Sequence, residues 1–195
     1  SDYTTGYGTF LVKYDNAGDV QWAQLFDSPD ACYSTGVTLD GSGNVYVSGS
    51  FRTSINIGAI NFTSTGRKDG FVAKFNSAGV HQWARLMSGH SDASALATAA
   101  DDSSGSVYVV GGFGYAAGDT ISFGASVTLT NIGGGILGTG IGDAFLAKYD
   151  GSTGMAQWAQ RAGGTNFDGY TGVSTDSQGN IFVGGGSGGT GVLDG

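Results

Sequence analysis

The sequence predicts an all-β fold of three tandem four-stranded antiparallel sheets, with β-ribbons inserted between them. Three observations predict it. A strand–turn–strand segment recurs three times, a second strand-rich segment follows each copy, and glycine supplies 38 of the 195 residues against a single proline. Short strands joined by tight turns need such glycines, because glycine reaches positive φ without steric cost.

The first segment occurs three times, at Phe10–Phe26, Phe71–Met87 and Phe145–Ala162. In its first copy Phe10, Val12 and Tyr14 occupy alternate positions, which is the period of a β-strand. Residues 15–18 form a polar turn, and Val20–Phe26 forms the returning strand. Each copy is therefore predicted to be a β-hairpin.

The second segment follows each copy of the first, at Leu39–Gly49, Asp101–Gly111 and Thr175–Gly185. Its first copy has a short strand at Val37–Leu39, a turn at residues 40–44 and an apolar run at Val45–Val47. Such a run between turn residues is typical of a buried strand. This segment is predicted to be a second hairpin.

Two consecutive hairpins make a four-stranded meander, which is the blade of a β-propeller. The inserts Ile55–Gly70 and Ile121–Asp143 each contain a short alternating run, so each is predicted to add a ribbon at a sheet edge. The predicted units are residues 1–70 (first repeat with its insert), 71–142 (second repeat with the longer insert) and 143–195 (third repeat). Together they form one continuous repeat domain.

Three blades are too few to close a ring, because propellers close with about four to eight. The chain is therefore expected to be a segment of a longer protein or to associate with further copies edge to edge. Unpaired edge strands favour the second outcome, since they template pairing with other chains.

The stretch Gly142–Asp150 reads GDAFLAKYD, and the second segment reads D-x-x-G-N-V-Y-V-x-G in its first copy. These motifs resemble the SBBP repeat, a β-propeller repeat of long, mostly extracellular or cell-surface proteins. The resemblance covers nearly the whole chain. It implies propeller architecture and an extracellular or cell-surface location, and it implies no catalytic residues. Only the third copy keeps the family's Gly-Gly-x-x-x-Asp stretch, at Gly163–Asp168.

The net charge of −8 argues against nucleic acid as a partner, because phosphate binding needs clustered Lys and Arg and the eight basic residues are scattered. No run of 18 apolar residues occurs, so no membrane insertion is predicted. The single cysteine, Cys32, excludes an internal disulfide framework. It is expected to be a free thiol, with an intermolecular disulfide as the alternative.

Aromatic residues recur at equivalent positions and are predicted to form the core: Trp22, Trp83, Trp158, Phe10, Phe71, Phe145, Tyr46, Tyr108 and Phe182. Each tryptophan is expected to pack one blade on the next, with its N–H bonded by a neighbour. The alternative is an indole that stacks on sugar rings. The recurring lysines are expected to pair with turn aspartates across blades: Lys13, Lys74 and Lys148.

Aspartate and glycine recur in the turns, at Asp40, Asp102, Asp176, Gly43, Gly105 and Gly179. Aspartate opens such turns by accepting hydrogen bonds from the following backbone. Calcium ligation is the alternative, but no copy has the spacing of a calcium loop and the chain is almost devoid of Glu. No cofactor is predicted.

Catalytic and metal-binding constellations are not predicted. His90, Ser91 and Asp92 are immediate neighbours, whereas a triad is assembled from separate elements. His81 is a single-copy substitution on a strand, and two lone histidines make a poor metal site. Asn61 opens the sequon Asn61-Phe62-Thr63 and would be an N-glycosylation acceptor in a secreted protein.

The function predicted is that of a non-enzymatic extracellular structural or adhesive repeat protein. Copies of the chain, or further blades of the same protein, would assemble edge to edge or blade to blade into a surface appendage, fibre or matrix. The alternative is a glycan- or protein-binding propeller module of a larger cell-surface protein. Its candidate contact residues are Tyr33, Phe62, Phe123 and Tyr170.

Overall fold

The computed structural model describes residues 7–124, 126–133, 142–188 and 191–193. These residues form strands, turns and loops without a helix, so they contain no helix that could cross a membrane. The strands are β1 (Tyr7–Tyr14), β2 (Val20–Ser28), β3 (Cys32–Leu39), β4 (Val45–Phe51), β5 (Ser54–Ile57), β6 (Ile60–Thr63), β7 (Asp69–Phe75), β8 (His81–Gly89), β9 (Ala93–Asp101), β10 (Ser106–Phe113), β11 (Thr120–Ser122), β12 (Thr128–Thr130), β13 (Asp143–Asp150), β14 (Ala156–Gly164), β15 (Asp168–Thr175), β16 (Ile181–Ser187) and β17 (Gly191–Leu193).

The strands form two large sheets and three strand pairs, and every pair of neighbours is antiparallel. The first central sheet has the order β12-β11-β8-β7-β4-β3, and the second central sheet has the order β17-β14-β13-β10-β9. The N-terminal pair is β1-β2, the C-terminal pair is β15-β16, and β5-β6 is a separate ribbon.

The prediction that consecutive hairpins pair into one sheet is wrong. Strand β4 pairs with β7 through Val47↔Ala73, and β10 pairs with β13 through Val109↔Ala147, whereas β2 and β3 lie in different sheets. Each central sheet thus joins the second hairpin of one repeat to the first hairpin of the next. Pro29 lies in the corner between β2 and β3 and has no N–H to extend a ladder.

The central sheets therefore cross the predicted unit boundaries at residues 70 and 142. Two complete meanders, β3-β4-β7-β8 and β9-β10-β13-β14, are flanked by the N-terminal and C-terminal pairs, so three four-stranded sheets are not formed within the described residues.

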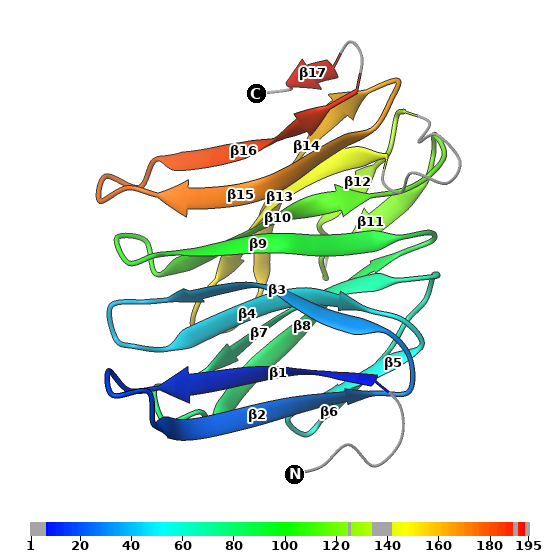
Figure 1. The fold of residues 1–195 in the computed structure, drawn as a ribbon. Coiled ribbons are helices and arrows are strands. Elements are labelled where there is room, and N and C mark those ends of the chain that lie inside the picture. The colour runs from blue at the N-terminus through cyan, green and yellow to red at the C-terminus, as the bar shows by residue number, and fades with distance from the viewer. Residues whose placement is uncertain (1–6, 125, 134–141, 189–190, 194–195) are drawn as a thin grey trace.

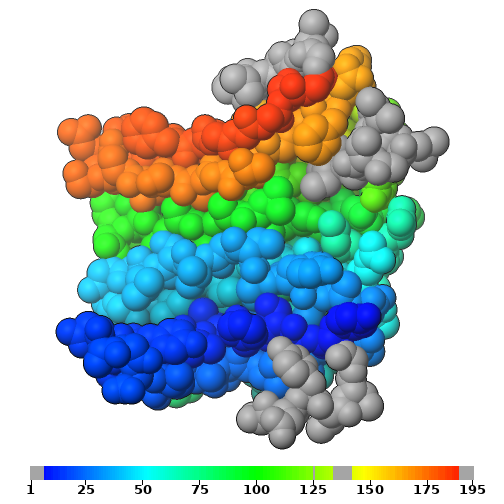
Figure 2. Space-filling model, viewed as in Figure 1, coloured from blue at the N-terminus to red at the C-terminus, as the bar shows by residue number. Residues whose placement is uncertain are grey.

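The sheets stack as layers in chain order (Figures 1 and 2). Strand β9 packs across β3 and β4, β15 packs across β9 and β10 in the same way, and β1 contacts β3. The N-terminal and C-terminal pairs lie at opposite ends of the stack (Figure 1). One packing rule is repeated from layer to layer.

The core lies between the layers, so the central strands bury both faces. Tyr46 and Val72 pack toward the second central sheet, while Val45, Val47 and Ala73 pack toward the N-terminal pair. Every residue of β4 and of β10 is buried. A continuous apolar run is the expected sequence for a strand that is covered on both faces.

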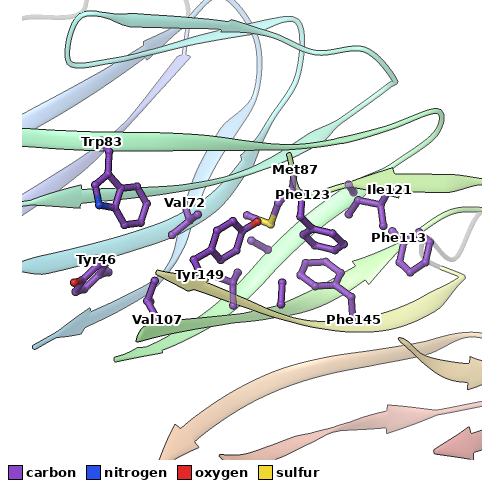
Figure 3. Packing of buried hydrophobic residues seen from close by; sticks show 14 residues of the cluster. Tyr46, Val72, Trp83, Met87, Val107, Phe113, Ile121, Phe123, Phe145 and Tyr149 are labelled. Carbon is purple, nitrogen blue, oxygen red and sulfur yellow. The ribbon is translucent and has the colours of Figure 1, made fainter. Parts of the chain in front are cut away.

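An aromatic cluster fills the space between the two central sheets (Figure 3). The rings of Phe123 and Phe145 meet edge to face with centroids 5.1 Å apart, beside Met87 and Tyr149. Phe123 comes from the long insert, so this insert adds to the core as well as to an edge.

Both inserts form hairpins, as predicted, but among the described strands only the second joins the edge of a larger sheet. β5-β6 is a separate ribbon, and β11-β12 joins the outer edge of the first central sheet through Ile121↔Gly89. β17 joins β14 in the same manner, through Leu193↔Ala162. Residues 134–141 of the long insert lie outside the described residues. The added strands cover outer edges that would otherwise be open to pairing.

We call the hairpins β3-β4, β9-β10 and β15-β16 the inner hairpins. In each of them a recurring glycine in the second strand faces a bulge in the first strand. The ladders shift register opposite Gly49, Gly111 and Gly185. A Cβ at these positions would lie 2.0, 1.8 and 2.1 Å from the carbonyl oxygens of Tyr33, Ser94 and Gly169, respectively. The motif V-Y-V-x-G therefore ends in glycine because the backbone of the bulged strand occupies the place of a side chain.

Replacing one of these glycines tests whether the backbone of the bulged strand excludes a side chain. We expect Gly111→Ala to lower the free energy of unfolding by about 1–3 kcal/mol or more, because the methyl group overlaps the Ser94 carbonyl and the Phe145 ring. Gly184→Ala is the matched control, since a Cβ there meets nothing within 4 Å. Urea unfolding measures both, and equal stability of the two variants would contradict this account.

Candidate functional site

One backbone carbonyl of the second central sheet collects side chains from the first. The indole N–H of Trp83 donates to the carbonyl oxygen of Gly151 at 3.1 Å, and Nζ of Lys74 donates to the same oxygen at 2.8 Å. Gly151 lies in the turn between β13 and β14, and Trp83 is only 6% exposed. We call this arrangement the turn-carbonyl contact; it joins two successive sheets.

The N-terminal pair makes the same contact to the first central sheet. Trp22 donates its indole N–H to the carbonyl oxygen of Ser77 at 3.1 Å, and Lys13 donates to that oxygen at 3.3 Å. Ser77 lies in the turn between β7 and β8, equivalent to the turn of Gly151. Trp22 and Trp83 thus pack between successive sheets, and their N–H groups are hydrogen-bonded. The indole N–H of Trp158 donates to no acceptor among the described residues.

Each central sheet also carries a cluster of one tyrosine, one lysine and one tryptophan on three neighbouring strands. The rings of Tyr46 and Trp83 are 5.9 Å apart, and Nζ of Lys74 lies 5.0 Å from the centre of the Tyr46 ring. The second central sheet repeats this Tyr–Lys–Trp cluster with centroids 6.0 Å apart and the lysine 5.7 Å from the ring: Tyr108, Lys148 and Trp158. Ammonium groups are attracted to aromatic faces at such distances.

The predicted pairing of a recurring lysine with a turn aspartate forms once among the described residues, between two repeats but within one sheet rather than across sheets. Nζ of Lys74 lies 3.7 Å from the Asp40 carboxylate, and both residues belong to the first central sheet. The contact across sheets is made to backbone carbonyls instead. Spacing in the sequence shows that lysine recurs, but a backbone acceptor leaves no residue signature.

The repeated aspartates cap their turns. Oδ1 of Asp40 accepts the backbone N–H groups of Ser42 and Asn44 at 3.0 and 2.9 Å. Asp176 does the same for Gln178 and Asn180 at 2.9 Å each. The turn glycines have φ of 75°, 63° and 82°, at Gly43, Gly105 and Gly179. This geometry is that of the aspartate turn rather than of a calcium loop.

Asp102 is an exception, and the alignment that made it equivalent to Asp40 is wrong. The turn between β9 and β10 is one residue longer, so Asp101 accepts the N–H of Ser103 at 2.9 Å and takes the capping role. Asp102 instead accepts the N–H of Gly41 from the preceding sheet at 2.6 Å. It therefore ties two neighbouring turns together.

Hydrogen bonds in the turns shift the acidity of the capping carboxylates. Burial pushes the pKa of Asp40 upward, but bonds from Asn44 and Tyr46 outweigh it and lower the pKa below its ordinary value. The hydroxyl of Ser152, together with bonds from Thr153, lowers the pKa of Asp150 to about 2. These groups stay ionised because their turns donate to them.

The histidine loop does not assemble a triad. His90 is exposed, the hydroxyl of Ser91 donates to Asp119 at 2.7 Å, and Asp92 accepts the hydroxyl of Tyr115 at 2.6 Å. His81 is half-buried and packs its ring edge on Phe75. Within the described part of the chain, no group of three or more His, Cys, Asp or Glu residues is arranged to hold a metal ion.

Burial separates the predicted core aromatics into three classes. Phe71, Phe145, Tyr46 and Tyr108 are at most 3% exposed, whereas Phe10 and Phe182 are 64% and 60% exposed. Trp22 and Trp158 are half-buried. The prediction that Phe10 and Phe182 lie in the core is wrong for the described chain. Both lie on the terminal pairs, where no further sheet covers them.

Two apolar end faces result. The N-terminal end face consists of exposed side chains of β1 and β3: Tyr7, Phe10, Tyr14, Tyr33, Val37 and Leu39. An open groove of about 280 Å³ runs along it between these strands. The C-terminal end face carries Phe182 on β16, which is exposed at six of its seven positions.

The remaining candidate residues lie apart. Tyr33 is exposed on β3, Phe62 is half-buried on β6, Phe123 is fully buried and Tyr170 is half-buried on β15. They therefore do not line one pocket.

Asn61, the predicted N-glycosylation acceptor, is exposed on β6, and its amide donates to Asn56 at 2.7 Å. Cys32 is a free thiol at 5% exposure in the core beside Phe26, and burial raises its pKa.

No family model matches the chain, so the resemblance to the SBBP repeat stays a prediction. The chain is similar to an uncharacterized WD repeat-containing protein of Acanthamoeba polyphaga mimivirus, with 26% identity over 131 residues. The match covers 58% of this chain and 9% of the length of that protein. Together with the antiparallel all-β structure, this distant match is consistent with a propeller-like repeat.

The turn-carbonyl contact can be tested by removing one indole N–H. We expect Trp83→Phe to lower the free energy of unfolding by about 1–3 kcal/mol, through the lost hydrogen bond and a packing void. Trp158→Phe is the matched control in the isolated chain, because its N–H bonds no described acceptor. Thermal or urea unfolding measures both variants, and a larger loss for Trp158→Phe would refute the assigned role.

Asp150 should make stability depend on pH in the acid range. Its pKa is about 2 in the folded chain and about 3.9 in an unfolded one, so its contribution is complete above pH 4 and is lost as the pH falls toward 2. We expect Asp150→Asn to be less stable than the parent at neutral pH and to lose less stability between pH 4 and 2. Urea titrations across this range measure it; identical slopes would contradict the assignment.

Proposed function

We propose that the chain is a non-enzymatic structural or adhesive repeat protein whose copies assemble into a surface appendage, fibre or matrix. One observation carries the proposal. Positions that are fully buried in the central sheets are exposed in the terminal pairs, so each end of the stack presents an apolar face. Contiguous exposed apolar surface marks sites of association.

The stacking rule supports this proposal. The turn-carbonyl contact and the inner bulge each recur along the stack, so further layers can be added by the same contacts. We propose that the two central meanders are propeller-type blades and that the terminal pairs are halves of further blades. The net charge of −8 opposes indiscriminate association, which leaves the end faces to direct it.

An extracellular or cell-surface location is part of the proposal. The motifs that resemble a cell-surface repeat support it. Protease treatment of intact source cells should remove the protein if it is exposed outside the membrane.

Glycan binding is the competing function. It would need an exposed aromatic at equivalent positions of each repeat, whereas the Trp22 and Trp83 N–H groups are bonded to turns and the other candidate aromatics lie apart. Binding on a glycan array by the monomeric chain would favour this function over assembly.

Assembly should be visible with the purified chain. We expect concentration-dependent oligomers by sedimentation velocity, and rings or fibres by electron microscopy. Phe10→Asp should reduce them because it charges an end face, whereas Val80→Asp, at an equally exposed residue outside both end faces, should not. A chain that remains monomeric at all concentrations would overturn the proposed function.

A further inference from the structure

The two terminal pairs correspond to the two halves of one central sheet. In each central sheet the middle ladder joins the second strand of an inner hairpin to the next strand, through Val47↔Ala73 or Val109↔Ala147. The repeated sequence places Val183 of β16 at the position of Val47, and Val12 of β1 at the position of Ala73. Among the described residues, neither β16 nor β1 has a partner on that edge.

The Tyr–Lys–Trp cluster is split between the two ends in the same way. Lys13 and Trp22 already converge on the Ser77 carbonyl, but no ring of the described residues lies beside Trp22 as Tyr46 lies beside Trp83. The residue equivalent to Tyr46 is Phe182, at the opposite end of the stack and 60% exposed. The third cluster would be complete only if Phe182 met Lys13 and Trp22.

The N-terminal end face has the shape that an incoming strand pair requires. Strand β9 packs across β3 and β4, and β15 packs across β9 and β10. By the same rule β3 should pack across the equivalents of β15 and β16 in a preceding sheet. Among the described residues neither is present there, and of that sheet β3 contacts β1, the equivalent of β7. The groove beside β1 lies where those strands would run, and Phe10, Tyr14 and Val37 line it.

A second contact would form between Trp158 and the turn that joins β1 and β2. Gly79 and Gly154 lie against the rings of Trp22 and Trp83, so that a Cβ there would come within 2.7 and 2.6 Å of them. The equivalent Gly18 faces open space. Trp158 is the tryptophan whose N–H bonds no described acceptor, and the carbonyl equivalent to that of Ser77 belongs to Asn16.

We propose that the C-terminal pair of one copy and the N-terminal pair of a second copy join into one four-stranded sheet, β15-β16-β1-β2. β16 pairs antiparallel with β1 through Val183↔Val12, and Phe182 completes a cluster with Lys13 and Trp22 of the second copy. The inference rests on the proposed function and specifies its contact. The contact is head to tail, so it yields a ring if the rotation closes and a fibre if it does not.

Cysteine cross-linking tests the register. On a Cys32→Ala background, a mixture of Val12→Cys and Val183→Cys chains should form a disulfide-linked dimer on mild oxidation, because directly opposed strand residues have Cα atoms about 4.5–5.5 Å apart. The matched control is a mixture of Val12→Cys and Gly184→Cys chains. It should cross-link poorly, since residue 184 is the neighbour of Val183 on β16 and a Cβ there points to the other face of the sheet, where it meets nothing within 4 Å.

The outcomes separate the inference from the proposed function. Oligomers that cross-link equally in both mixtures, or in neither, overturn the register and leave self-assembly standing. Chains that stay monomeric and never cross-link overturn both the register and the self-assembly. This outcome is also the one expected if other parts of the same polypeptide cover the two ends. Selective linkage through Val183→Cys supports both.

The cluster itself has a second test. Phe182→Ala should weaken self-association about tenfold or more, as expected for an aromatic that anchors an interface. Phe182→Tyr should retain the association, because tyrosine occupies this position in both central sheets. Circular dichroism of the dilute chain should be unchanged in both variants, since Phe182 is exposed there. Equal loss in both variants, or none in either, overturns the role of Phe182.

Discussion

A backbone carbonyl in an outer turn is the acceptor on which the stack depends. At Gly151 it takes the N–H of a buried tryptophan and the ammonium of a lysine from the preceding sheet, and at Ser77 the same pair recurs. A buried indole without an acceptor would cost free energy, and a charge-assisted donor strengthens the bond. The contact therefore fixes where each turn lies on its neighbour.

The strand pairing of each inner hairpin is constrained by its own backbone. There the bulged strand places a carbonyl where the second strand would carry a side chain, so glycine recurs at Gly49, Gly111 and Gly185. The turn-carbonyl contacts fix how one layer sits on the next, and the bulges fix the strand pairing within a layer. Trp22, Trp83 and the three recurring glycines are thereby engaged in packing contacts.

Strands, turns and inserted ribbons could be predicted from the sequence because period and glycine placement are local. Strand partners could not, since periodicity does not say whether β3 continues the sheet of β2. The chain changes sheet there, as it does between β8 and β9 and between β14 and β15. The exchange of roles between Asp101 and Asp102 followed from one extra turn residue that an ungapped alignment hides. The exposure of Phe10 and Phe182 depends on the neighbouring layer rather than on their own segments.

The central claim is that the terminal pairs are halves of one sheet that self-association completes. Amide hydrogen exchange of assembled and dilute chains measures it most directly, because ladder hydrogen bonds slow exchange. We expect β1 and β16 to become protected on assembly to the level of their equivalents β7 and β10, while β4 and β13 stay unchanged. Continued rapid exchange of both β1 and β16 in the assembled state would contradict the account.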